Sequence, residues 1–261
     1  MSANEQDATG PHAGKVIWVT GASGALGGAV ARRLASQGAQ VIASARSVAQ
    51  TDFGDDASAA HIERFALDIT DTEAVNAAAR EIAARYGRID GSVASTNVAS
   101  FGDFTELDDD AWYRVVEAKL LGTVRLFRAV LPVLIEQKRG ALVAISGRGG
   151  IDPPPQHFPG ASINASLDTL VQGIGRLYGP HGVRANSVAP GPIRSPRYDQ
   201  LEQADTSKAG ARANRYSDVA LGAPGEPGDV ADAVSYLLSD AARFVNGTRL
   251  FVDGGGPGYA R

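Results

Sequence analysis

The chain has 261 residues, of which 44% are hydrophobic and 21% charged, a composition typical of a globular protein with a sizeable core. Its net charge of −4 argues against nucleic acid or an anionic membrane as the main partner, and the absence of cysteine excludes disulfides and thiol chemistry. No apolar run reaches the roughly 20 residues that span a bilayer, and we expect a cytoplasmic protein.

Short β-rich apolar runs alternate with longer helical patterns along the chain. Residues 1–13 come before this pattern and are polar with interspersed glycine and proline, which predicts a mobile tail. The predicted strands cover residues 15–20, 39–45, 62–69, 89–96, 140–146, 183–189 and 248–255. The predicted helices cover residues 24–38, 71–87, 108–140, 161–179 and 228–240.

This alternation predicts right-handed crossovers and a doubly wound, mostly parallel β-sheet with helices on both faces. No repeat or linker interrupts the pattern, so we expect a single α/β domain over residues 14–261. Asp71 is expected to cap the helix that follows it. The segment at about 194–220 is polar and has no continuous apolar stripe, and we expect it to form a lid over a substrate cleft.

The stretch VTGASGALGGA joins the first predicted strand to the first predicted helix. Glycines at such a junction let the backbone turn tightly and approach a pyrophosphate, while the helix N-terminus supplies amides and a positive dipole. A glycine-rich turn can also be no more than a tight connection. Its place directly after the first strand favours dinucleotide binding.

The residues that follow the second predicted strand bear on the choice of nucleotide. A ribose 2′-hydroxyl is usually held by an acidic residue at the end of this strand, whereas a 2′-phosphate needs a cation. Here the strand ends in ASA and Arg46 follows it. We therefore expect NADP(H) rather than NAD(H). The alternative is that Arg46 is an ordinary solvated loop residue.

Over residues 14–256 the chain resembles the short-chain dehydrogenases/reductases. Thr20, Gly21 and Gly27 match the ends of the family motif T-G-x-x-x-G-x-G, although its middle glycine falls on Ala25. Asp68 in LDIT matches the acidic residue that the family places near the adenine. VRANSVAPGPI and the C-terminal stretch PGEPGDVADAVSYLLSDAARFVNGTRLFVDGG match two further family signatures.

The resemblance implies a Rossmann-type domain that binds NAD(P). It also implies the residues that line the nucleotide site, which are Gly21, Ser23, Gly24, Ala25, Leu26, Gly27, Arg46, Asp68, Ile69, Ala94, Ser95, Pro190, Gly191 and Ile193.

The four residues that usually carry catalysis in this family are changed here. Alignment through the flanking motifs places the family's Tyr on Gly160, its Lys on Asn164, its Ser on Gly147 and its Asn on Lys119. The chain therefore resembles a divergent branch that lacks the usual Asn-Ser-Tyr-Lys set. The Asn and the Lys are exchanged between two helices, which indicates replacement rather than simple loss.

Four residues are candidates for catalysis in place of the usual set: Lys119, Ser146, His157 and Asn164. Lys119 lies on a largely apolar helix face, where a lysine must pair, extend to water or lose its charge. It either stands near the cofactor ribose or substrate, or serves a helix or subunit contact. Ser146 ends a strand and could simply bond to backbone, and His157 could be an exposed residue of its Pro-rich loop. We rank Lys119 first.

Three functions are compatible with this pattern. The first is an atypical NADP(H)-dependent oxidoreductase that acts on an unknown small molecule without the usual Tyr and Lys. The second is a non-redox enzyme such as an isomerase, cyclase or lyase, and the third is a nucleotide-binding or partner protein without catalysis. We expect a homotetramer or homodimer, because the apolar positions of helices 109–137 and 161–178 extend beyond one face. We identify no metal site.

Overall fold

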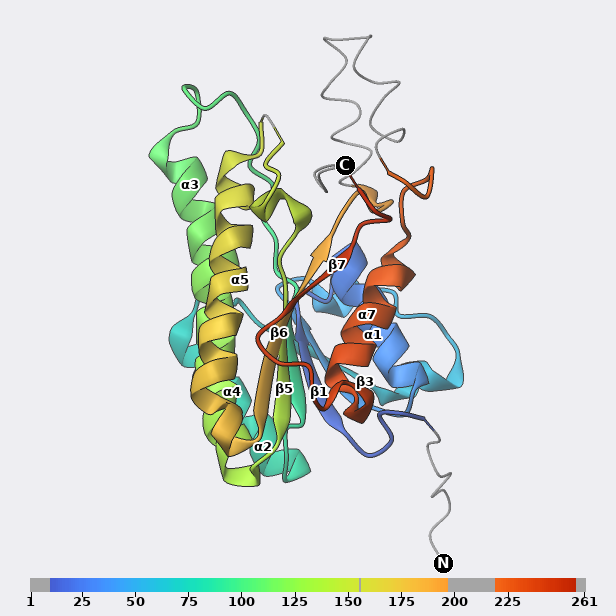
Figure 1. Cartoon of the computed structure of the whole chain (residues 1–261). Helices are drawn as coiled ribbons and strands as arrows, with labels where there is room; N and C mark the ends of the chain where they lie inside the picture. The colour runs from blue at the N-terminus through green and yellow to red at the C-terminus, as the bar shows by residue number, and fades with distance from the viewer. Residues whose placement is uncertain (1–9, 155, 197–218, 257–261) are drawn as a thin grey trace, which may run out of the picture.

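A parallel β-sheet forms the centre of the computed structural model, which describes residues 10–154, 156–196 and 219–256 (Figure 1). In these ranges its order is β3-β2-β1-β4-β5-β6-β7. Because β1 pairs with both β2 and β4, the chain reverses its direction of travel across the sheet at this point. The strands are β1 (Val16–Thr20), β2 (Gln40–Ala45), β3 (Ile62–Ala66), β4 (Gly91–Ala94), β5 (Gly140–Ile145), β6 (Val183–Pro190) and β7 (Arg249–Val252).

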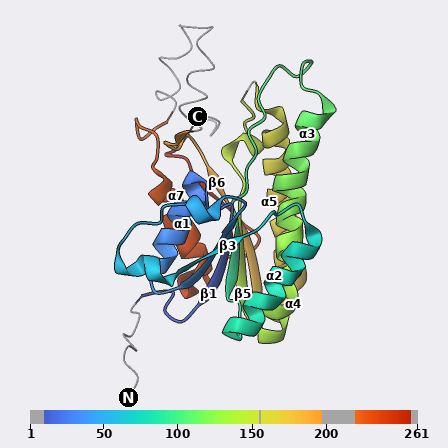
Figure 2. The same ribbon diagram turned by 180° about the vertical axis from the view of Figure 1, so that it is seen from behind.

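Helices cover both faces of the sheet, which confirms the predicted doubly wound α/β fold (Figures 1 and 2). One face carries α1 (Ala25–Ser36) and α7 (Pro227–Leu238), and the other carries α2 (Thr72–Tyr86), α3 (Asp109–Val115), α4 (Gly122–Gln137) and α5 (Phe158–Tyr178). Each layer has its own apolar core, built around residues such as Leu34 and Val234 on one side and Trp18 and Leu126 on the other. Within the described ranges no helix is both long and apolar enough to cross a membrane.

The long helix predicted over residues 108–140 is not one continuous α-helix. A π-helical turn, Val116–Leu121, separates α3 from α4. Such a turn leaves backbone carbonyls without their usual partners, and here the hydroxyl of Thr123 donates to the carbonyl oxygen of Lys119 at 2.7 Å. The turn places Lys119, which is buried, opposite the end of β5. The expectation of an uninterrupted helix over residues 108–140 is therefore wrong at the segment that contains Lys119, one of the candidate catalytic residues.

The loop between β3 and α2 is shaped by two aspartates. The strand expected over residues 62–69 ends at Ala66 instead, because Oδ1 of Asp68 accepts hydrogen bonds from the amide and hydroxyl of Thr70 and so turns the backbone out of the ladder. The predicted cap is confirmed: Asp71 accepts from the amide of Ala74 at 3.0 Å.

The mobile tail expected over residues 1–13 needs correction in its described part. Residues 10–13 form a turn in which the amide of His12 donates to the carbonyl of Gln37, and the His12 side chain is completely buried. Burial of an imidazole between α1 and α7 holds this segment against the domain. The rest of the expected tail, residues 1–9, lies outside the described residues. The same holds for residues 197–218, which make up most of the lid expected at 194–220.

The His12 imidazole is held in its neutral form. Its Nε2 lies 3.0 Å from Oγ of Ser235, and that hydroxyl donates its own proton to Oε1 of Gln37 at 2.5 Å, so Nε2 carries the hydrogen. Among the described residues, Nδ1 has no hydrogen-bond partner. Burial, followed by the nearby charge of Lys15, lowers the pKa of His12 from 6.5 to about 4.

We expect the free energy of unfolding to decrease as the pH falls from 6.5 towards 4. In this window the unfolded chain binds a proton at residue 12 and the folded chain does not. At about 1.4 kcal/mol per pKa unit, the loss amounts to about 3 kcal/mol at most. Urea unfolding at a series of pH values should show this slope in the wild type and a flatter one in His12→Gln. His61→Gln, at an exposed histidine, is the control. Equal slopes in wild type and His12→Gln would contradict the assignment.

Candidate active site

The loop between β1 and α1 approaches neighbouring backbone too closely for side chains. Gly21 has a φ of 70°, and a β-carbon there would lie 2.6 Å from the carbonyl oxygen of Ser95, at the end of β4. A β-carbon on Gly27 would overlap the carbonyl oxygen of Gly21. The N-cap of α1, Gly24, offers no side-chain cap, so the first amides of this helix are open to an anion. This local geometry fits a pyrophosphate.

A cavity of about 450 Å³ lies beside this loop. It is bounded by the loop, the first turns of α1 and the segment after β2, which supply Ser23, Gly24, Ala25, Gly28, Arg32, Ser47, Gln50, Thr51, Asp52 and Pro196. Its lining combines backbone amides, hydroxyls, the carboxylate of Asp52 and the guanidinium of Arg32, which donates to the carbonyl oxygen of Asp52 at 3.2 Å. The amides, hydroxyls and guanidinium are groups that can bind a nucleotide's phosphate and ribose. The sequence analysis did not identify Arg32, because no sequence motif distinguishes a helical arginine that lines a cavity from one that is exposed to solvent.

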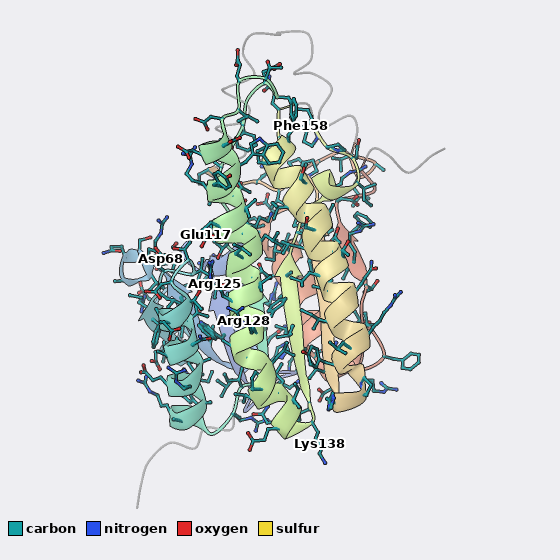
Figure 3. The ribbon with its side chains drawn as sticks, turned by 90° about the vertical axis from the view of Figure 1, so that its left-hand side faces the viewer. Asp68, Glu117, Arg125, Arg128, Lys138 and Phe158 are labelled. Atoms are coloured by element: carbon teal, nitrogen blue, oxygen red, sulfur yellow. The ribbon has the colours of Figure 1, made fainter. Side chains whose placement is uncertain are left out.

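Arg46 and Asp68 lie at the carboxyl ends of β2 and β3, and both are exposed. The pKa of Asp68 is lowered mainly by the hydrogen bonds from Thr70, with smaller contributions from the positive charges of Arg46 and Arg125. In Figure 3, Asp68 lies close to α2, while Glu117 lies in the π-helical turn and Arg125 lies on α4. The positive charge of Arg46 thus acts on the Asp68 carboxylate at the neighbouring strand end.

The turn after β6 packs against the end of β7. The amide of Gly191 donates to the carbonyl of Val252 at 3.0 Å, and a β-carbon on Gly191 would lie 2.7 Å from that of Asp253. Ile193 is buried and pairs with Gly225 in an isolated bridge. This turn begins at Pro190, at the carboxyl end of β6. Because the strands are parallel, it lies at the same end of the strands as the glycine loop, which follows β1.

Three of the four candidate catalytic residues meet in one buried cluster at the end of β5. Nζ of Lys119 donates to Oδ1 of Asn164 at 2.6 Å and to the carbonyl oxygen of Ser146 at 3.1 Å. The hydroxyl of Ser146 donates to the carbonyl of Val188 at 3.3 Å. The sequence leaves open whether Lys119 pairs, extends to water or loses its charge. In the structure its Nζ is paired with two protein acceptors, and these hydrogen bonds join the π-helical turn to the end of β5 and to α5.

Glycines after β5 make room for this cluster. Gly147 has a φ of 153°, and a β-carbon there would lie 2.6 Å from Nδ2 of Asn164. One on Gly150 would lie 2.8 Å from the amide of Ala165. Asn164 thus takes the space that a side chain at position 147 would need, so the residues at these two positions are sterically linked.

A buried ion pair fastens the same loop to the C-terminal strand. Nη1 of Arg148 lies 3.0 Å from Oδ2 of Asp253, and the two side chains are only 11% and 6% exposed. Arg148 also reaches Asp152, at 3.5 Å. Asp253 accepts a hydrogen bond from the amide of Gly255. The sequence analysis did not identify this pair, because its two residues are 105 positions apart and leave no local signal.

His157, the fourth candidate, precedes α5 and lies over Gly160. A β-carbon on Gly160 would overlap Nε2 of His157 and lie 2.7 Å from its Cδ2 and Cε1. The ring of Phe101 packs on the imidazole, with centroids 4.8 Å apart, and Phe104 meets Phe158 edge-on at 5.3 Å. Phe158 marks this end of α5 in Figure 3, and Lys138 marks the opposite end of the molecule.

The comparisons with known proteins agree with this geometry. A family model described as enoyl-(acyl carrier protein) reductase matches residues 21–256. The L-rhamnose 1-dehydrogenase (NAD(P)(+)) of Azotobacter vinelandii is 32% identical over 92% of this chain and 96% of its own. The 3-oxoacyl-[acyl-carrier-protein] reductase FabG of Thermotoga maritima is 27% identical over 93% of this chain and 97% of its own.

The solved structures similar to the chain include a protein from Burkholderia xenovorans that is assigned to the short-chain dehydrogenases/reductases. Its TM-score is 0.86 at 31% sequence identity, and the match covers 95% of this chain and 98% of that one. The likeness therefore extends over the whole described fold.

We expect Arg148→Met to lower the free energy of unfolding by about 3–5 kcal/mol, because it leaves the buried Asp253 carboxylate without its guanidinium. The double variant Arg148→Met/Asp253→Asn should lose less than the sum of the two single changes. Arg33→Met, which breaks an exposed pair with Asp232, is the matched control and should cost less than about 1 kcal/mol. Urea unfolding measures all four, and equal costs for the two arginine variants would refute the buried pair's role.

Proposed function

Because the chain belongs to the short-chain dehydrogenase/reductase family, we propose that it is an NADP(H)-dependent oxidoreductase acting on a small-molecule carbonyl or alcohol. The observation that carries this proposal is the glycine loop that follows β1, where the order of the strands reverses between β1 and β4. At Gly21 and Gly27 the neighbouring backbone is too close for any side chain. In open α/β sheets, ligands bind at this point, outside the carboxyl ends of the strands.

The dinucleotide, when bound, supplies or accepts a hydride. The chain's own contribution is to hold it: the amides at the start of α1 would bind the pyrophosphate, and the turn at Pro190–Ile193 would face the nicotinamide. Arg46 and Arg32 would share the 2′-phosphate, because the first ends β2 and the second lines the adjoining cavity. Asp68 would lie near the adenine.

We propose that the reaction is atypical, without the family's Tyr and Lys. Gly160 offers no phenol, and Asn164 offers no ammonium at its position. The residues proposed for the reacting end of the site are Lys119, Ser146, His157 and Asn164. Because positioned acid–base groups usually contribute about 10²–10⁴-fold, simple ketones and alcohols should turn over slowly, and activated carbonyls faster.

A second candidate function is nucleotide binding without catalysis. The observation that favours it is that the Nζ of Lys119 and the hydroxyl of Ser146 both donate to protein acceptors, as in a purely structural cluster. A non-redox isomerase, cyclase or lyase would need an enlarged pocket at Gly160, but His157 lies over this position, so no observation favours that function.

We expect isothermal calorimetry to show tighter binding of NADPH than of NADH. Arg46→Ala and Arg32→Ala should each reduce this preference by roughly 10–100-fold, the equivalent of a lost charge-assisted hydrogen bond. Arg80→Ala, at an exposed arginine on α2, should leave it unchanged. No preference in the wild type would overturn the choice of NADP(H), and an unchanged preference in Arg46→Ala would remove Arg46 from the site.

We also propose a homotetramer or homodimer. Tyr113 on α3, Leu121 in the π-helical turn and Leu177 on α5 expose apolar area on the outer layer. Light scattering at micromolar concentration should therefore return two or four times the chain mass of 27.0 kDa. A monomer mass would contradict this proposal without touching the nucleotide site.

A further inference from the structure

The four candidate residues differ in burial and in chemistry, since Lys119, Ser146 and Asn164 are buried. Nζ of Lys119 donates to Asn164 and to the backbone of Ser146 in a buried place. The hydroxyl of Ser146 donates to Val188. An amide such as that of Asn164 does not ionise near neutral pH and so does not act as a general acid. His157 is only half-buried, and its imidazole is chemically suited to proton transfer.

The position of His157 is defined by the glycine that follows it by three residues. A β-carbon on Gly160 would overlap Nε2, so the imidazole fills the volume into which a side chain from position 160 would extend. His157 precedes α5, and its imidazole lies over Gly160, which shares one helix face with Asn164 because positions four apart are neighbours. Asn164 on this face contacts Lys119 at the end of β5. The imidazole therefore lies one turn from that cluster, at the carboxyl edge of the sheet.

Contacts from a second loop hold the ring in place. Phe101 packs against the imidazole, and the amide of Gly102 donates to the carbonyl of Gln156 at 3.1 Å. The loop that carries Phe101 leaves the sheet at β4, whose end contacts Gly21 of the glycine loop. The segment from the end of β4 to Phe101 therefore connects the glycine loop to His157. The ring is half-buried, which leaves it accessible to a ligand.

We propose that His157 is a catalytic residue that supplies the proton in place of the absent phenol, a role that rests on the proposed reductase function. As hydride adds to the substrate's carbonyl carbon, the C=O π bond opens and its electron pair moves to oxygen. The N–H bond at Nε2 of the imidazolium breaks, and its proton joins that oxygen to give the alcohol. The neutral imidazole then recovers a proton from water. In alcohol oxidation the same nitrogen accepts the proton.

The test uses the full chain, NADPH and the activated keto ester ethyl benzoylformate, whose reduction to ethyl mandelate is followed by loss of NADPH. His157→Ala should reduce kcat by about 10²–10⁴-fold while the calorimetric affinity for NADPH stays within about twofold. Gly160→Ala should act in the same direction, because its methyl group displaces the imidazole. His61→Ala, at an exposed histidine away from the site, is the matched control and should keep wild-type activity.

Chemical rescue separates proton transfer from a packing role. In His157→Ala, added imidazole should restore turnover, and a series of substituted imidazoles should give rates that follow the pKa of the azole rather than its size. Rates that follow size alone, or no rescue, would overturn the role of His157 as donor.

A readout independent of turnover is carbethoxylation of His157 by diethyl pyrocarbonate, located by peptide mass spectrometry. Bound NADP⁺ should slow the modification of His157 and leave that of His61 unchanged. Equal modification with and without NADP⁺ would place the imidazole outside the site and overturn the proposal.

The remaining outcomes separate the two proposals. Full activity in His157→Ala, with NADPH bound, would overturn this inference and leave the reductase function intact. Failure of the wild type to reduce ethyl benzoylformate or any ketone of a broad panel, although NADPH binds, would overturn the reductase function itself and the inference with it.

Discussion

The hydrogen bond from Nζ of Lys119 to Asn164 determines how the reacting end of the molecule is assembled. A buried ammonium is costly unless acceptors surround it, and here the amide oxygen of Asn164 and the backbone of Ser146 supply them. To bring these acceptors together, α5 must approach the segment after β5 closely, which requires glycine at positions 147 and 150. The contact between Lys119 and Asn164 therefore constrains the backbone after β5 and in the first turns of α5.

The two ends of the candidate site are built from different materials. At the nucleotide end the geometry comes from backbone: close approach at Gly21 and Gly27, and uncapped amides at the start of α1. At the proposed reacting end it comes from the side chains of Lys119, Ser146 and Asn164. A family resemblance consequently transfers more securely to cofactor binding than to the catalytic step, and that step has to be argued from contacts such as that between His157 and Gly160.

The sequence was sufficient for the fold, since alternating periodicity identifies every strand of the described sheet and places the glycine loop after β1. It also singled out Lys119 and Asn164, which the structure joins by a hydrogen bond. Three features could not be predicted. The π-helical turn depends on tertiary fit around Lys119, the end of β3 depends on a side-chain hydrogen bond of Asp68, and the Arg148–Asp253 pair joins distant parts of the chain. Each arises from a contact that no local pattern encodes.

The π-helical turn has a consequence for how such a site could have arisen. Its hydrogen bonds span one residue more than those of an α-helix, so it amounts to a single inserted residue accommodated within an otherwise regular helix. At 3.6 residues per turn, an extra residue that was not taken up in this way would rotate the following helix by about 100°. Because the π turn takes up the extra residue locally, deleting one residue between Val116 and Leu121 would restore a regular helix, with α3 and α4 oriented as they are now, and would change only which side chain of this segment is presented to β5. Length changes in this short segment, and not only point substitutions, could thus have altered the chemistry of the cleft while the sheet was preserved.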